Sequence, residues 1–93
     1  MTRPCGHDPA YCVAPGIHWI VEERGVRIID ELARRSEVLG YPEAAVWELL
    51  LRGHSLPETV RMVKHIAGVT EEHAQMSVEQ CIDRWCKAGW LTE

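Results

Sequence analysis

Residues 17–30 of the chain read Ile-His-Trp-Ile-Val-Glu-Glu-Arg-Gly-Val-Arg-Ile-Ile-Asp. β-Branched and aromatic residues stand on both sides of its glycine, a composition typical of two strands joined by a tight turn. We therefore expect an antiparallel hairpin over residues 17–30, with Arg24-Gly25 as a two-residue turn.

The position of the turn sets the register of this hairpin. With Arg24-Gly25 at the turn, the facing pairs are Glu23 with Val26, Glu22 with Arg27, Val21 with Ile28, Ile20 with Ile29, Trp19 with Asp30 and His18 with Glu31. One face then carries Trp19, Val21 and Ile28, and the other carries an Ile20–Ile29 pair flanked by opposite charges. Because both faces hold apolar side chains, we expect each to be partly covered.

A third strand follows the hairpin. Residues 30–35 contain good helix formers and allow a helical turn, but we expect a loop there. Residues 36–41 read as a short strand with Val38 and Leu39 at its centre, and Pro42 comes directly after it. The sequence thus predicts a three-stranded antiparallel sheet.

The apolar spacing becomes helical after Pro42, which suits the first turn of a helix that ends at Arg52-Gly53. The next helix begins at Ser55, where the Ser55 hydroxyl and the Glu58 carboxylate form a capping box. Gly68 supplies the left-handed residue that ends it.

A third helix starts at Thr70 and ends at Ala88-Gly89. Its apolar residues share one helical face and predict a single buried stripe, consisting of Ala74, Val78, Cys81, Ile82 and Trp85. We expect Trp90 and Leu91 to fold back on the core. The predicted class is α+β, a three-stranded antiparallel sheet followed by three helices.

Residues 17–93 are expected to form one domain. Residues 1–16 hold three of the five prolines and little apolar periodicity, so a mobile tail or an irregular strap is expected there.

Composition limits the possible functions. The chain has 93 residues, 46% of them hydrophobic and 26% charged, which is typical of a globular protein. A domain of this size has a thin core and little room for a deep substrate cleft, which disfavours an autonomous enzyme. The net charge of −4 disfavours a partner recognised mainly through its phosphates.

No run of about 18 apolar residues occurs, and no apolar secretory segment follows Met1. We therefore expect a cytoplasmic protein with reduced thiols at its four cysteines, Cys5, Cys12, Cys81 and Cys86.

Four short motifs accompany this order of elements. They are Ala-Val-Trp-Glu-Leu-Leu at 45–50, Arg-Gly-His-Ser at 52–55, residues 58–63, and Ala-Gly-Trp-Leu at 88–91. Over residues 17–91 the chain resembles the PqqD-like family, named for a pyrroloquinoline quinone synthesis protein. It departs from the family at Gly40-Tyr41-Pro42, where members often carry Leu-Asn, and in its cysteine-bearing segment before Ile17.

The resemblance implies a small winged-helix-like domain that recognises ribosomally made, post-translationally modified peptides. It implies that a precursor (leader) peptide adds as an extra strand to the third strand and lies in a groove against the third helix. The bound peptide would then be presented to a maturase, often a radical S-adenosylmethionine enzyme.

The residues support this expectation independently, because a short edge strand beside a helix is a template for strand addition. The expected peptide-binding residues are Ser36, Glu37, Val38 and Leu39 on the strand, and Gln75, Glu79, Ile82 and Cys86 on one flank of the third helix. The sequence does not decide which flank faces the strand. The alternative is that Val38, Leu39 and Ile82 are simply core residues.

The side chains of Cys5, His7 and Cys12 are of the types that bind zinc. The second closely spaced pair of a standard zinc site is missing. Cys81 and Cys86 lie five residues apart on a helix, so they point in different directions. We expect Cys81 in the core, and no catalytic residue, metal or other cofactor.

Two other functions remain open from the sequence. A winged-helix DNA-binding protein has a similar order of elements, although the third helix offers only Arg84 and Lys87 against several acidic residues. An assembly domain that forms a homodimer through its edge strand is the other.

Overall fold

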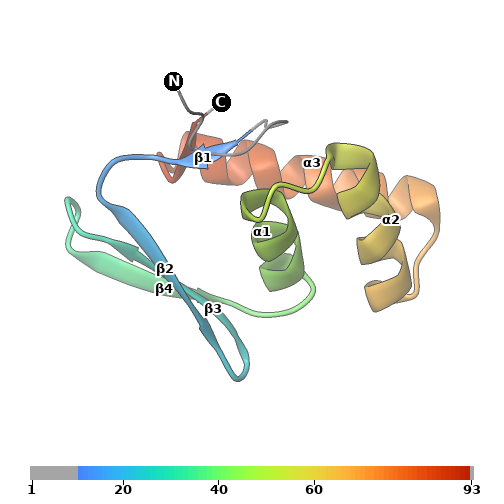
Figure 1. Cartoon of the computed structure of the whole chain (residues 1–93), viewed down its shortest axis with the longest axis horizontal. Helices are drawn as coiled ribbons and strands as arrows, with labels where there is room; N and C mark the ends of the chain where they lie inside the picture. The colour runs from blue at the N-terminus through green and yellow to red at the C-terminus, as the bar shows by residue number, and fades with distance from the viewer. Residues whose placement is uncertain (1–10, 93) are drawn as a thin grey trace.

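The computed structural model of the chain describes residues 11–92. Its elements run in the order β1 (Cys12–Val13), β2 (Ile17–Glu22), β3 (Gly25–Asp30), β4 (Arg35–Leu39), α1 (Glu43–Leu51), α2 (Leu56–Ala67), α3 (Glu71–Lys87) and β5 (Leu91–Thr92) (Figure 1). Strands β2, β3 and β4 form an antiparallel sheet in that order, and three helices follow it. The predicted fold class is confirmed.

A second, two-stranded sheet joins the two ends of the described chain. β1 pairs antiparallel with β5, so that Cys12 lies opposite Thr92 and Val13 opposite Leu91. The Ala14 amide also donates to the Trp90 carbonyl at 2.9 Å. Part of the segment expected to be a tail or strap therefore pairs with the C-terminal end of the domain.

The predicted register of the hairpin is wrong by two residues. Val21 pairs with Val26 and Trp19 with Ile28, so the turn consists of Glu23 and Arg24. Gly25 is instead the first residue of β3, where an added Cβ would collide with the Leu39 carbonyl oxygen of β4. The glycine thus serves the close approach of two strands and not the turn.

A shift of two residues keeps every side chain on its predicted face. Trp19, Val21 and Ile28 still share one face, as expected. The Ile20–Ile29 pair does not form, because Ile20 lies opposite Arg27 and Ile29 lies opposite His18.

Strands β3 and β4 are joined by a loop, as expected for this segment. The Ala33 amide donates to the Asp30 side chain at 3.1 Å, and Arg34 closes the loop in the left-handed conformation with a φ of 57°. β4 starts one residue earlier than predicted and ends at Leu39.

The predicted helix caps of α2 and α3 are confirmed. The Ser55 side chain accepts from the Glu58 amide at 3.2 Å, and the Glu58 side chain accepts from the Ser55 amide at 3.1 Å. Gly68 ends α2 in the left-handed conformation, and Thr70 caps α3 by accepting from the His73 amide at 3.1 Å.

A cluster of four tryptophans lies at the centre of the core. Trp47 of α1 is completely buried and makes edge-to-face contacts with Trp19, Trp85 and Trp90 at centroid distances of 6.4, 5.1 and 6.2 Å. The whole predicted α3 stripe is buried, and Trp90 and Leu91 fold back on the core as expected.

Candidate functional site

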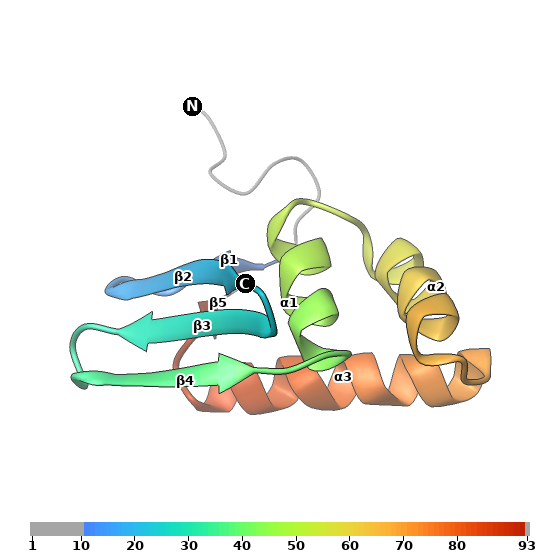
Figure 2. The ribbon, with the colours of Figure 1, turned by 90° about the horizontal axis from the view of Figure 1, so that it is seen from below.

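Strand β4 is an edge of the main sheet, on the side nearest α3 (Figure 2). Within residues 11–92 it pairs with β3 and with no other strand. Its opposite edge can therefore accept the backbone hydrogen bonds of an additional strand.

The four predicted strand residues divide into two groups. Ser36, Glu37 and Val38 are exposed, and Val38 keeps 44% of its surface accessible although it is apolar. Leu39 is buried in the core, which matches the alternative reading for that residue. The strand thus has a buried end that anchors it and an exposed stretch that is available to a partner.

A hollow of about 460 Å³ begins where β4 ends, and we call it the β4 hollow. It is lined by Gly40, Tyr41, Pro42, Glu43, Val46, Val63, Ala67, Val69, His73, Ser77, Gln80, Cys81 and Arg84. These residues come from the β4–α1 connection, from α1, from the end of α2 with the turn after it, and from one flank of α3. The lining of the hollow includes three valines, Val46, Val63 and Val69, and polar side chains of α3.

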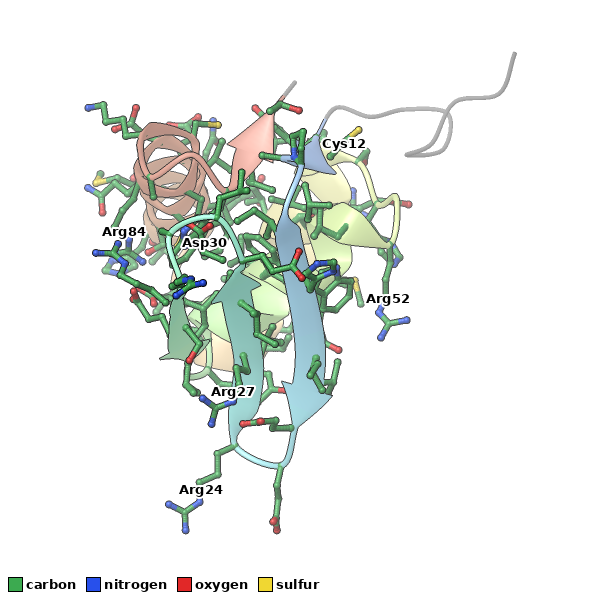
Figure 3. The ribbon with its side chains drawn as sticks, turned by 90° about the vertical axis from the view of Figure 1, so that its left-hand side faces the viewer. Cys12, Arg24, Arg27, Asp30, Arg52 and Arg84 are labelled. Atoms are coloured by element: carbon green, nitrogen blue, oxygen red, sulfur yellow. The ribbon has the colours of Figure 1, made fainter. Side chains whose placement is uncertain are left out.

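Arg84 stands at the border between this hollow and the sheet. Figure 3 shows it between α3 and β4. Its guanidinium donates to the Glu43 carboxylate at 2.8 Å. This hydrogen bond raises the pKa of Arg84, and the nearby charges of Glu43 and Glu37 add smaller increases. The ion pair links α3 to the first turn of α1 beside the edge strand.

Cys81 lies in the wall of the β4 hollow. The pKa of its thiol is raised to about 11, chiefly by burial and to a smaller extent by the neighbouring Glu43 carboxylate, while Arg84 acts to lower it. The thiol is therefore neutral near pH 7 and acts as a small apolar group. This agrees with its expected place in the core.

The predicted residues on α3 do not face β4. Gln75, Glu79, Ile82 and Cys86 line two hollows on the opposite flank, beside the start of α2 and Tyr11, and none of the four lines the β4 hollow. The grouping of these four residues with the β4 edge is thus corrected by the structure.

The flank that faces the β4 hollow consists of His73, Ser77, Gln80 and Arg84, together with Cys81. The apolar stripe of α3 tells which side of the helix is buried but treats its two flanks alike. Only the packing of α3 against α1 and β4 distinguishes them. The helical spacing of Ser77, Gln80 and Arg84 places these residues on one face of α3. The sequence shows that face, but only the packing shows that it is the one toward β4.

Of the three residues considered as zinc ligands, Cys5 and His7 lie outside the described residues, because they precede residue 11. Cys12 is disulfide-bonded, which corrects the expectation of a reduced thiol at this position. Cys81 and Cys86 retain their thiols. Within residues 11–92 no group of three His, Cys, Asp or Glu side chains is arranged to hold a metal.

The two basic residues that the DNA-binding alternative needs on α3 each lie beside a carboxylate. Arg84 contacts Glu43 at 2.8 Å and Lys87 contacts Asp83 at 3.1 Å. In the part of the chain that the structure describes, no helix has the length and apolar character needed to cross a membrane.

Comparison with known proteins gives one match at the level of structure. No protein-family model matches the chain, and no curated protein matches it by sequence. A solved structure of lasso peptide synthetase B1 complexed with the leader peptide superimposes with a TM-score of 0.81 at 17% sequence identity. The match covers 89% of this chain and 98% of that protein. At this identity the likeness establishes the fold that the two proteins share.

Proposed function

We propose that this protein is a noncatalytic adaptor that binds a precursor peptide as an additional strand on β4. The observation that carries the proposal is the open edge of β4, which leads directly into the β4 hollow beside α3. Backbone hydrogen bonds along the edge would supply affinity, and the hollow would receive a side chain of the peptide and supply specificity.

Among the described residues, strand β2 forms the other unpaired edge of the sheet, but β4 fits the proposal better. The hollow adjoins the end of β4 through Gly40, Tyr41 and Pro42, so a peptide on this edge meets a ready binding surface. The solved structure with the same fold contains a leader peptide, which supports the same class of ligand here.

Presentation of the peptide to a modifying enzyme is the second half of the proposal. It rests on the resemblance to the PqqD-like family, in which the enzyme is often a radical S-adenosylmethionine maturase. Affinity capture of the tagged protein from its native lysate, followed by mass spectrometry of peptides and proteins, should recover a short peptide together with such an enzyme. Capture of the peptide without any enzyme would support peptide binding and contradict presentation to an enzyme.

The binding site itself is tested with the captured peptide and isotope-labelled protein. We expect amide shifts along residues 36–39 and at Ser77, Gln80 and Arg84. A Ser77→Trp variant should weaken binding at least about tenfold, because the larger side chain fills the hollow.

The matched control is Met76→Trp, one residue earlier on α3, where the side chain is exposed and does not line the hollow. This variant should bind the peptide normally. Equal losses in both variants, or shifts that avoid β4, would contradict the proposed site. A tight homodimer in light scattering would instead favour the assembly-domain alternative.

A further inference from the structure

A second groove runs along the flank of α3 that faces away from β4. It consists of two hollows of about 210 and 420 Å³ that share Leu56 and Glu79, and we call it the α2–α3 groove. Along α3 it extends from Glu71 to Cys86, which corresponds to about 22 Å at the helical rise. This length suits a segment of polypeptide better than a small ligand.

The groove has an apolar strip that the described residues, 11–92, leave partly uncovered. Val60 and Ile82 are buried and contribute to its two hollows, whereas Leu56 keeps 38% of its surface accessible. Leu56 is the first residue of α2, directly after the capping box at Ser55. The cap fixes where the helix starts and thereby holds this leucine at the surface.

The charge of the groove is predominantly negative. Its lining includes the carboxylates of Glu71, Glu79 and Asp83 against the single guanidinium of Arg61. Lys64 and Lys87 approach Glu71 and Asp83 at 3.9 and 3.1 Å, but these pairs are largely exposed to solvent and therefore weak.

Glu79 is the acidic residue common to both hollows. The side-chain amide of Gln75 donates a hydrogen bond to the Glu79 carboxylate at 3.2 Å and orients it. Over residues 11–92 no Lys, Arg or His lies within ion-pair distance of Glu79. An uncompensated carboxylate thus lies beside an exposed leucine at the centre of the groove.

We propose that the α2–α3 groove binds a basic amphipathic helical segment of a partner protein. An apolar side chain of that segment would cover Leu56 and Ile82, and a Lys or Arg would pair with Glu79, as in other helix-in-groove complexes. The groove is lined by residues of α2 and α3 and by Tyr11, and it shares no lining residue with the β4 hollow. Because the two sites lie on opposite flanks of α3, one molecule can hold both ligands at once.

The test uses the full chain, isotope-labelled, and two synthetic helical peptides of about 15 residues. One carries leucines at helical spacing with lysines elsewhere, and the other has glutamate in place of each lysine. The lysine peptide should shift the amides of Leu56, Gln75, Glu79 and Ile82, and the glutamate peptide should not. Glu79→Lys should weaken binding of the lysine peptide at least about threefold.

The matched control is Glu23→Lys, which makes the same change in net charge at the exposed hairpin turn. It should leave the affinity unchanged, and an equal loss would show that only overall charge matters. Shifts at β4, or an equal response to both peptides, would overturn the proposal. Shifts of the groove amides on dilution would also overturn it, because they would show that a second copy of the chain occupies the groove. Contacts from residues 1–10 to Leu56 in the free protein would overturn it as well.

Discussion

Among single residues, Cys81 has an altered acid–base chemistry with a measurable consequence. Its pKa is raised from 9.0 to about 11, chiefly by burial. At pH 8 the reactive thiolate is therefore about a hundredfold scarcer than in an exposed cysteine. We expect alkylation of Cys81 to be at least that much slower than in the unfolded chain, and to accelerate as pH rises toward 11. Mass spectrometry of the modified peptide against pH measures this.

Cys86, which is only half-buried on the same helix, is the internal comparison. It should be alkylated faster than Cys81 at every pH below about 11. Equal rates at the two positions in the folded protein would contradict the buried, neutral thiol.

Arg34 carries local backbone strain in the loop directly before the edge strand β4. Its φ of 57° is the left-handed conformation, which costs a residue with a Cβ about 1–2 kcal/mol. Glycine removes this cost but increases the entropy of the unfolded chain, so Arg34→Gly should stabilise the protein by about 0.5 kcal/mol. Urea unfolding measures the change. Arg35→Gly, inside β4, should destabilise, and stabilisation by both variants would refute the explanation.

At the scale of elements, the pairing of β3 with β4 depends on Gly25. A Cβ at this position would meet the Leu39 backbone, which cannot move without displacing β4. Gly25→Ala should lower the free energy of unfolding by about 1–3 kcal/mol and disturb the amides of β4. Thermal unfolding and amide spectra check both effects.

Gly40→Ala is the matched control, because nothing lies within 4 Å of an added Cβ there. The φ of Gly40 is not positive, so alanine can adopt the same backbone conformation. This variant should retain the stability and spectrum of the parent. Similar losses at both glycines would show that the strands do not approach as closely as described.

The elements that were predicted correctly are those specified by neighbours in sequence. Ser55 with Glu58, Gly68 and Thr70 mark helix ends through contacts within one turn, and the α3 stripe follows from helical period alone. The predicted hairpin register is wrong because Gly25 is required by its close approach to Leu39, a residue of another strand, and not by the turn. Local turn chemistry contains no information about that contact.

The same distinction explains the partial success at the candidate site. Strand β4 could be predicted because the residue types that favour a short strand are neighbours in the sequence. The flank of α3 was assigned incorrectly because Ser77 and Gln80 are distinguished from Gln75 and Glu79 only by where β4 and α1 pack. In the absence of that packing, a helix with one apolar stripe has two equivalent borders.

At the scale of the whole molecule, Trp47 connects the sheet, the helices and the C-terminal segment. It is completely buried against Trp19 of β2, Trp85 of α3 and Trp90. Trp47→Ala should lower the free energy of unfolding by about 3–5 kcal/mol, because a large cavity opens where these elements meet. A domain of this size has little stability beyond that, so we expect most of the variant to be unfolded at 37 °C.

Trp47→Phe separates packing from hydrogen bonding in the same position. The Trp47 indole nitrogen is buried and has no hydrogen-bond partner among the described residues, so phenylalanine removes an unsatisfied donor along with part of the ring. We expect a loss of only about 1–2 kcal/mol in urea unfolding, with the β4 amides and the peptide affinity unchanged. A loss as large as that of alanine would mean that the indole N–H makes a bond essential to the fold, and the tryptophan cluster would then be more than an apolar contact between the sheet and α3.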